Sequence, residues 1–412
     1  MRDRKDSGLP WVGDIPVDWN VYRGKNVVKK LKRPVKDTDG VITCFRDGEV
    51  TLRSNRREEG FTFSEQEVGY QGIEPGDLVI HGMDGFAGSI GISDSRGKGT
   101  PVLNVLDSKN DKRFLMYYFR TIAKCGYFES VATGIRVRTC DTNWNKISAT
   151  PCLVPPLAEQ YRIAAYLDER CAKIDEAIAR HDALIKKLDE YRKAVIIDAV
   201  TKGVRGKREM KESGIEWIGQ IPSEWSVKRG KFFLTLLNRP TVENDGVITC
   251  FRDGEVTLRS RRREEGFTFA IQEAGYQGIE PGDLVIHKMD GFAGAIGVSD
   301  SRGKGTPALN VLDSSENKDY LKYYFRAVAF LGYFESIATG IRVRTCDTGW
   351  PKIQQTPCML PSQKEQSEIV AYLDEKCAAI DAAKERHAQL MAKLEEYKKS
   401  LIYYAVTGKI EC

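Results

Sequence analysis

The sequence lacks every segment that would place the chain in a membrane. It has no apolar run of about 18 residues or more, the length that a membrane helix needs. Its first residues, MRDRKDSGLPW, contain no apolar stretch of the kind a secretory signal requires. The ten cysteines are scattered, with no C-x-x-C pair and no histidine at metal-ligand spacing. We therefore expect a cytoplasmic protein with free thiols, no metal site and no membrane partner.

Motifs that bind catalytic cofactors are also absent. No glycine-rich stretch for S-adenosylmethionine follows a predicted strand, and residues 154–157 (VPPL) lack the Asn and the aromatic residue of an N-P-P-[YF] tetrad. Residues 97–100 (GKGT) lack the earlier glycine of a phosphate-binding G-x-x-x-x-G-K-[ST] loop. The histidines are His81, His181, His287 and His387. We expect a protein that is not an enzyme and holds no cofactor of its own.

What the sequence does contain is a long segment, Leu157 to Val200, without glycine or proline. Pro155 and Pro156 precede it and Gly203 follows it, as helix start and stop signals do. Alternating steps of three and four residues connect Ile163, Leu167, Ile174, Ile178, His181, Ile185, Leu188 and Val195. That spacing predicts a coiled-coil helix of roughly 40 residues and about 60 Å. Because its outer faces are polar, it needs a partner helix.

The partner helix is predicted in the same chain, from Ser362 to Val406. Ile369, Leu373, Ile380, His387, Met391, Leu394 and Leu401 repeat the spacing. A constant offset of 206 residues, half of the 412, relates Gln160 to Gln366 and Tyr166 to Tyr372. The chain is therefore two copies of one unit, end to end.

Each copy opens with a tryptophan-containing segment and continues as a globular region. Trp11, Trp19, Trp217 and Trp225 are expected to anchor these segments in a core, with ligand stacking as the alternative. In the first copy we expect a hairpin (41–45 and 50–54), a strand ending at His81, strands at 89–93 and 102–106, a loop DSRGKG, a helix (112–123) and a strand (135–139). The predicted domain is mixed and rich in β-strands.

The two globular copies are nearly identical, whereas the predicted helices have drifted. Asp39–Phe63 and Asp245–Phe269 differ only by Asn55 against Arg261. Gly69–Gly88 and Gly275–Gly294 differ only by Gly82 against Lys288, and Ala132–Thr142 matches Ala338–Thr348 fully. Core positions tolerate exchange when volume and period are kept. We infer that the globular domain presents one surface with one task, carried out twice.

The matching stretches carry repeated arginines, and the glycine-rich loop DSRGKG adds Arg96 and Lys98. Arginine forks suit guanine edges and phosphates, so we predict a nucleic-acid contact surface. The candidates are Arg46, Arg53, Arg56, Arg57, His81, Arg96, Lys98, Arg136 and Arg138, their copies Arg252, Arg259, Arg262, Arg263, His287, Arg302, Lys304, Arg342 and Arg344, and the two exchanged residues Arg261 and Lys288. The alternative is that these side chains pair with Asp47, Glu58 and Glu59 on a solvated face. The net charge of +5 permits an acidic polymer as partner without requiring one.

Three motifs together resemble the specificity subunit of Type I restriction-modification systems. They are the G-[IL]-x-W-[IV]-G-x-I-P-x-x-W openings, the [LV]-P-x-x-x-E-Q segments at Val154 to Gln160 and Leu360 to Gln366, and A-Y-L-D-E-[RK]-C-A-x-I-D in the helices. The resemblance covers essentially the whole chain. It implies an α+β protein in which two β-rich target-recognition domains are separated by two long antiparallel helices, a coiled-coil spacer with pseudo-two-fold symmetry. The expected parts are recognition domains at 1–155 and 205–360 and spacer helices at 156–204 and 361–412.

The resemblance also implies partners. Each recognition domain binds half of a split double-stranded DNA target, two methyltransferase subunits dock on the helices, and restriction (motor-nuclease) subunits join for cleavage. S-adenosylmethionine is expected on the methyltransferase, not on this chain. Because the two domains are almost duplicates, unlike those of the usual member, we predict an interrupted palindrome as the target. Left open are an orphan or anti-restriction variant, a stand-alone enzyme using His81 and Asp84, and an adaptor that binds no DNA.

Overall fold

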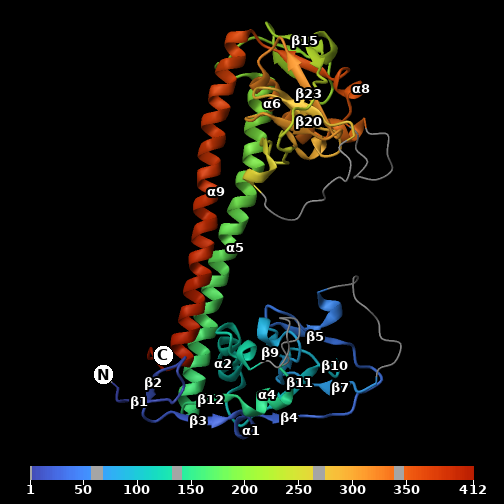
Figure 1. Cartoon of the computed structure of the whole chain (residues 1–412). Coiled ribbons are helices and arrows are strands. Elements are labelled where there is room, and N and C mark those ends of the chain that lie inside the picture. The colour runs from blue at the N-terminus through green and yellow to red at the C-terminus, as the bar shows by residue number, and fades with distance from the viewer. Residues whose placement is uncertain (1, 57–67, 132–141, 263–273, 338–347) are drawn as a thin grey trace. The chain divides into compact units, whose positions relative to one another are not determined.

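The computed structural model describes residues 2–56, 68–131, 142–262, 274–337 and 348–412, and Figure 1 gives the element order. The chain divides into two compact units. Unit 1 comprises Met1–His181 with Gln389–Cys412, and unit 2 comprises Asp182–Ala388. The division falls within both long helices, so each unit holds one globular domain and a stretch of each helix.

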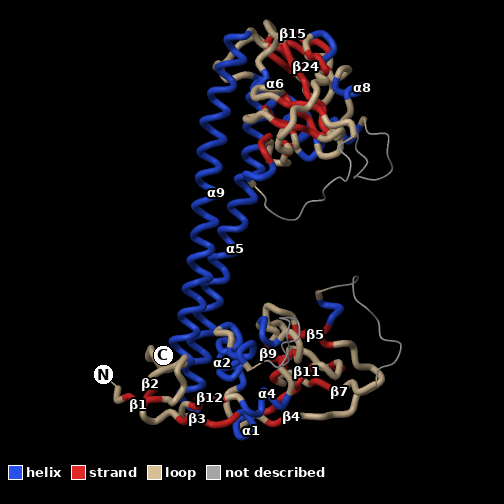
Figure 2. The backbone as a smooth tube through the Cα atoms, viewed as in Figure 1, coloured by secondary structure: helices blue, strands red, loops and turns tan. Residues whose placement is uncertain are grey.

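The centre of unit 1 is a four-stranded antiparallel sheet in the order β4-β11-β8-β9 (Figure 2). The strands are β4 (Lys29–Lys30), β11 (Leu103–Asp107), β8 (Leu78–His81) and β9 (Ile90–Ile92). Helix α2 (Lys112–Lys124) packs on it, and Phe114, Leu115 and Phe119 of that helix are fully buried. The pattern of apolar residues therefore predicted β8, β9, β11 and α2 correctly, whereas β4 was not predicted.

Two smaller strand pairs flank the sheet. β5 (Ile42–Cys44) and β6 (Val50–Leu52) form the expected hairpin. The predicted loop DSRGKG, however, contains strand β10 (Gly97–Gly99), which pairs with β7 (Gln71–Ile73). Its glycines serve close packing, because a Cβ atom on Gly97 would lie 2.5 Å from the carbonyl oxygen of Gly40. Glycine suggested a loop, but the structure needs it to let two backbones approach.

The tryptophan segment anchors unit 1 as predicted. Trp19 is fully buried, edge-on to Phe114, with ring centroids 6.4 Å apart. Its Nε1 donates to Glu159 Oε2 over 3.1 Å. Gln160 accepts from the backbone N–H of Asp111 over 2.9 Å, at the residue that caps α2. The E-Q pair of the motif therefore ties the start of the long helix to the opening segment and to α2.

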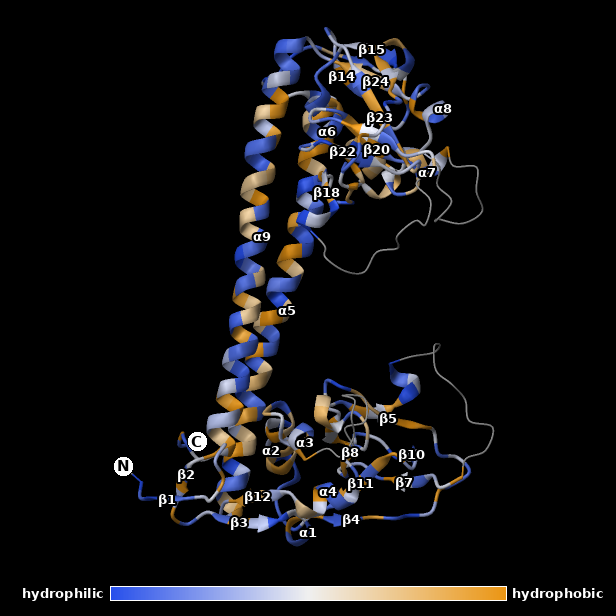
Figure 3. Cartoon of the chain, viewed as in Figure 1, coloured by the Kyte–Doolittle hydropathy of each residue, from blue (hydrophilic) through white to orange (hydrophobic). Residues whose placement is uncertain are grey.

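The long helices are α5 (Leu157–Lys202) and α9 (Gln363–Val406), and they run antiparallel within each unit. In unit 1, Lys398 pairs with Asp175, and Leu401, Ala405 and Val406 share one apolar cluster with Ile163 and Leu167. In unit 2, Asp189 pairs with Lys384 and Arg192 pairs with Asp381. Hydrophobic and hydrophilic residues alternate along both helices in Figure 3. The partner helix expected in the same chain is confirmed.

Unit 2 repeats this architecture, with a sheet in the order β16-β23-β20-β21. Its elements are β13 (Met210–Glu212), β14 (Gln220–Pro222), β15 (Ser226–Arg229), β16 (Leu234–Leu236), β17 (Ile248–Cys250), β18 (Val256–Leu258), β19 (Gln277–Ile279), β20 (Leu284–His287), β21 (Ile296–Val298), β22 (Gly303–Gly305), β23 (Leu309–Ser314), α6 (Lys318–Phe330), α7 (Tyr333–Ser336), α8 (Trp350–Ile353) and β24 (Pro357–Leu360). The remaining elements of unit 1 are β1 (Arg4–Asp6), β2 (Asp14–Pro16), β3 (Asn20–Arg23), α1 (Gly24–Val27), α3 (Tyr127–Ser130), α4 (Trp144–Ala149) and β12 (Pro151–Val154).

Three further expectations concern a strand, membrane helices and the cysteines. The predicted strand at 135–139 lies outside the described residues, as does its copy. Among the described residues, no helix is long and apolar enough to cross a membrane. All eight cysteines in the described part of the chain are free thiols.

Candidate nucleic-acid interface

The turn between β5 and β6 presents Arg46 to solvent. Gly48 has a φ of +92°, which the tight turn requires, and its N–H donates to the carbonyl of Phe45 over 3.0 Å. The Arg46 side chain is 73% exposed and one nitrogen, Nη2, donates to Asp84 Oδ1 over 2.8 Å. The remaining nitrogens of its fork have no partner among the described residues. Arg46 is therefore held in place by Asp84 and still able to bind an acceptor.

The second copy reproduces this arrangement closely. Arg252 is 69% exposed and donates to Asp290 Oδ1 over 2.7 Å. Gly254 has a φ of +93°. The two turns thus offer the same exposed guanidinium on the same support.

Arg56 and Arg262 reinforce these turns. Arg56 Nη1 lies 2.7 Å from Asp47 Oδ2 and 2.9 Å from Glu49 Oε2, and its guanidinium stacks 4.2 Å from the ring centroid of Phe45. Arg262 makes the corresponding contacts at the same distances. With two carboxylates and an aromatic face already engaged, Arg56 is better suited to hold the turn than to read a base.

Arg53 and Arg259 lie where the hairpin ends, in the short 3₁₀ turns Arg53–Asn55 and Arg259–Arg261. Arg53 Nε donates to Thr43 Oγ1 over 3.2 Å, and Arg259 Nε donates to Thr249 Oγ1 over 3.1 Å. These bonds direct both guanidiniums across the face of the hairpin. Their positions, like those of the turns, are the same in the two copies.

His81 ends β8 beside the Arg46–Asp84 pair, and its ring orientation is fixed by the backbone. Its Nδ1 accepts from the N–H groups of Met83 and Asp84 at 3.3 and 3.0 Å. Burial lowers the pKa of His81 more than Asp84 raises it, so the ring is neutral near pH 7. The proton then resides on Nε2, which makes that atom a hydrogen-bond donor. His287 repeats both bonds, at 3.2 and 3.0 Å.

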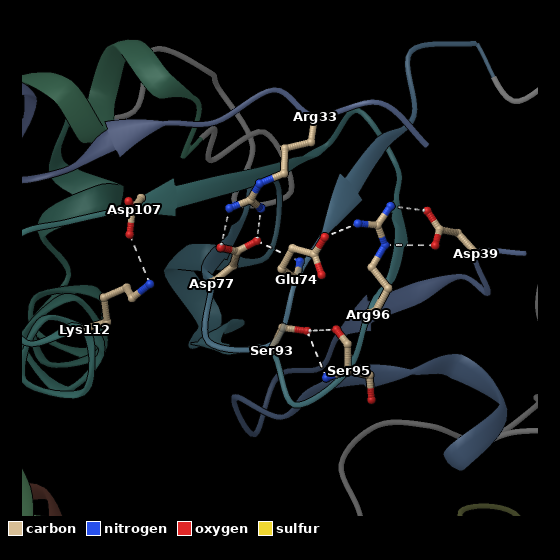
Figure 4. A network of polar contacts seen from close by, with 9 residues as sticks. All are labelled: Arg33, Asp39, Glu74, Asp77, Ser93, Ser95, Arg96, Asp107 and Lys112. Carbon is tan, nitrogen blue, oxygen red and sulfur yellow. Dashed lines mark hydrogen bonds and ion pairs between the residues drawn. The ribbon is translucent and has the colours of Figure 1, made fainter. Parts of the chain in front are cut away.

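Arg96 is engaged inside the domain, as Figure 4 shows. Its Nε and Nη2 donate to the two carboxylate oxygens of Asp39, each over 2.9 Å, and Nη1 donates to Glu74. The hydrogen bond from Arg96 holds the pKa of Asp39 at about 2. Arg302 pairs in the same way with Asp245 and Glu280. For these two arginines the contacts favour the alternative of pairing within the protein.

The remaining candidates are placed as follows. Lys98 and Lys304 are half-buried at the centres of β10 and β22. Arg57, Arg136, Arg138, Arg263, Arg342 and Arg344 lie outside the described residues.

Sequence reasoning missed a cation on the helix beneath the turn. Arg120 of α2 donates from Nη2 to the backbone carbonyl of Asp47 over 2.5 Å. In the second copy the guanidinium of Arg326 on α6 lies under Gly254. The sequence shows both arginines at the 206-residue offset, but only the packed structure shows that they meet the turn. A further missed pair, Arg33 with Asp77, is visible in Figure 4.

Two exchanges distinguish the copies at this surface. Asn55 Nδ2 donates to Thr51 Oγ1 over 2.8 Å, whereas Arg261 pairs with Asp300 at 3.1 Å. At the other exchange, a Cβ atom on Gly82 would lie 2.7 Å from the carbonyl oxygen of Val102, so a side chain there requires a small shift of the backbone.

In the second copy Lys288 faces Ala308, the counterpart of Val102, and its backbone N–H donates to the Ala308 carbonyl over 2.7 Å. The second copy thus has a larger residue in place of Gly82 and a smaller one in place of Val102. Lys288 lines a cavity of about 430 Å³ with Gln277, Asn310 and Trp350. The second copy therefore has one extra cation next to His287.

The sequence and the fold were compared with those of known proteins. No protein-family model matches the chain. The chain is 23% identical over 441 aligned residues to the Type I restriction enzyme EcoKI specificity subunit of Escherichia coli strain K12, an alignment that covers 97% of this chain and 90% of that protein. It is 32% identical over 133 residues to the EcoBI specificity subunit of Escherichia coli, covering 31% of this chain and 27% of that one.

Solved structures agree with the sequence matches. A chain from a study of complex assembly and conformational transition in the type I R-M system superposes with a TM-score of 0.73 at 15% identity, covering 96% of this chain and 99% of that one. The HsdS subunit from Thermoanaerobacter tengcongensis gives a TM-score of 0.54 at 16% identity, covering 96% and 98%. At these identities the structural likeness establishes the fold. In fold, and in sequence over almost its full length, the chain is similar to the specificity subunits of Type I restriction enzymes, and the resemblance predicted from its motifs is confirmed.

Proposed function

We propose that the chain is the non-catalytic DNA-recognition subunit of a Type I restriction-modification complex. It binds a bipartite double-stranded DNA target and positions methyltransferase and restriction subunits on it. The observation that carries the proposal is the repeated surface around the two hairpin turns. Arg46 and Arg252 are 73% and 69% exposed with the same support, and His81 and His287 have the same fixed ring, with Nδ1 bonded to the backbone and Nε2 as the donor. Exposed forks and fixed donors on a rigid β-scaffold suit base edges and phosphates.

Two equivalent surfaces read equivalent sequences. The hydrogen bonds that hold Arg46 and His81 in the first copy differ by no more than about 0.1 Å in length from those that hold Arg252 and His287 in the second. With the same donors held in the same way, the two domains select the same half-site. The antiparallel course of the helices in each unit favours inverted half-sites over a direct repeat. We therefore propose an interrupted palindrome, with a gap that the helices set.

The partners follow from the same proposal. Two methyltransferase subunits dock on the helical regions and carry S-adenosylmethionine, and restriction subunits join them. Among the described residues, no group of three or more histidine, cysteine or acidic side chains could hold a metal ion.

Reconstitution with the modification methyltransferase subunit of the same organism tests the proposal. Tight, sequence-specific binding should require both proteins, and its association constant should fall steeply with salt because phosphate contacts release counterions. Methyl transfer by the purified chain alone would support the stand-alone enzyme instead. Binding that is absent or insensitive to salt, with the methyltransferase present, would support the adaptor. Target methylation without a restriction gene nearby would identify the orphan variant.

A further inference from the structure

Unit 1 contains a cavity that the recognition surface does not explain. It has a volume of about 730 Å³ and lies where the turn after β5, helix α2 and the two long helices meet. Its basic lining residues are Arg46, Arg120, Lys124, Lys398 and Lys399, and its acidic ones are Asp47, Asp175 and Glu395. Arg46 belongs both to this cavity and to the candidate interface. The cavity is therefore continuous with the surface proposed to face DNA.

Most of the acidic charge at the cavity is already engaged. Asp175 pairs with Lys398 at 2.5 and 2.7 Å, and Asp47 pairs with Arg56 at 2.7 Å. Among the described residues, no carboxylate lies within ion-pair distance of Lys124 or Lys399. Glu395 offsets part of the remaining charge, and the five basic lining residues still outnumber the three acidic ones.

The environment of Lys124 agrees with this excess. Its side chain is exposed by surface area, yet enough protein surrounds the amine that partial burial lowers its pKa. The neighbouring charges of Arg120, Lys399 and Lys398 lower that pKa further, and the carboxylate of Glu395 raises it by less than these together lower it. Bringing like charges together costs free energy that a bound anion would recover.

The second copy closes the equivalent place with an aromatic ring. Phe330 stands where unit 1 has Lys124, and it lies 5.7 Å from the guanidinium of Arg326 and 5.6 Å from the Lys193 amine. Arg326, the counterpart of Arg120, is only 7% exposed and its Nε has no hydrogen-bond partner. In unit 2 the ring stabilises the cations through its π face. Among the described residues of unit 1 no ring takes this role, and the cavity occupies the place.

We propose that the cavity walled by Arg120, Lys124 and Lys399 binds a phosphate of the DNA backbone beside the half-site read by the first domain. This rests on the proposed function and adds a contact from α2 and α9 that the second domain lacks. Arg120 and the lysines supply the cationic donors that phosphate oxygens accept from, and Arg46 connects the bound phosphate to the base-reading surface. The two domains would then read the same bases, but the first domain would make one more contact with the DNA backbone than the second.

Reciprocal exchange between the copies tests this. In the reconstituted complex, the logarithm of the association constant for target DNA is measured against the logarithm of the salt concentration. K124F and K124Q should each reduce the slope by about 0.9, and weaken binding by on the order of tenfold at 0.1 M salt. F330K, which creates the open site in the second copy, should raise the slope by a similar amount. K112Q removes one lysine charge from the opposite end of α2 and should leave the slope unchanged.

Phosphate-ethylation interference then locates the contact. A position flanking the half-site should interfere in the wild-type complex and lose that interference in K124F. Unchanged slopes in both K124F and F330K, in complexes that still bind the target, would overturn the proposal and leave the proposed function intact. Saturation of the wild-type cavity by inorganic phosphate or adenosine monophosphate, abolished by K124F without a change of slope, would overturn it in favour of a free phosphate ligand. If the wild-type complex binds no specific DNA, the proposed function itself fails.

Discussion

The hairpin turns and the ends of α2 and α6 differ in how faithfully the two copies match. At the turns, Arg46 and Arg252 keep equivalent partners and similar exposure, and the following Gly48 and Gly254 keep the same positive φ. Some distance along the helices, Lys124 is replaced by Phe330, and an open charged cavity becomes a ring covering an arginine. Under the proposed function, this contrast means that the copies agree where a side chain contacts a base or a phosphate of the target. They diverge where only the local charge balance has to be satisfied.

The largest expected effect comes from removing the tryptophan that anchors each domain. Trp19→Ala and Trp225→Ala should each destabilise their own unit by about 3–5 kcal/mol, because a fully buried ring leaves a large cavity. Hydrogen exchange resolved along the chain should show the loss of protection in one unit at a time. Loss of protection throughout the chain from one substitution would mean that the units do not unfold separately.

Phenylalanine at the same two positions sharpens the comparison. Trp19 donates to Glu159, whereas the buried Nε1 of Trp225 has no partner. Trp19→Phe should therefore cost about 1.5–3 kcal/mol more than Trp225→Phe, the value of a hydrogen bond to a charged group. Denaturant unfolding of both variants measures this difference. Equal costs would contradict the asymmetry.

The equivalence of the two turns is tested by Arg46→Ala and Arg252→Ala. Each should weaken target binding by about 1–3 kcal/mol, because each removes the same exposed fork from the same support. In the K124F background, which removes the phosphate contact of unit 1, the two losses should agree. Competition binding of the reconstituted complex to its target gives both values. A large loss from one substitution and none from the other would show that the domains do not read alike.

A smaller effect is expected at the exchange beside His287. Lys288→Gly with Ala308→Val makes the second copy match the first, and it should lower the salt slope by no more than about 0.9 if the amine contacts one phosphate. Gly82→Lys with Val102→Ala should act in the opposite direction. The order of bases in the target should not change in either variant. A changed half-site would make Lys288 a base-reading residue.

The smallest expected effect concerns the Arg96–Asp39 pair. Its hydrogen bond holds the pKa of Asp39 near 2, below the ordinary 3.8. The pair therefore stabilises the fold fully above about pH 4, and this contribution is lost as pH falls through 2. The stability difference between wild type and Asp39→Asn, from urea unfolding, should be constant near neutral pH and shrink on acidification. A difference that grows on acidification would contradict the ion-pair assignment.

Sequence alone predicted the repeat, both long helices, their pairing and, in the described part of the first copy, strands β5, β6, β8, β9 and β11. The signals were periodic apolar residues, which can be recognised within one segment, and the constant offset, which is found by comparing the chain with itself. What it missed depends on contacts between distant segments. Gly97 looked like loop glycine, although the closeness of Gly40 makes it part of a strand. The sequence could not show that Asp39 already occupies Arg96, or that Arg120 lies under the turn.

The cavity in unit 1 could not be predicted from the sequence for the same reason. Lys124, Lys399 and Arg120 come from two helices that are far apart in the sequence. The offset does pair Lys124 with Phe330, so the exchange is visible in the sequence. The sequence does not show what this exchange does, because a lysine at the end of a helix is common and only the structure reveals its neighbours.

The central claim is that two equivalent readers recognise the same bases, and mapping of methylated positions across the source genome tests it most directly. The result expected is a single motif whose two halves are inverted copies of each other, separated by a fixed number of unspecified base pairs. Two unrelated half-sites on either side of the gap would contradict it.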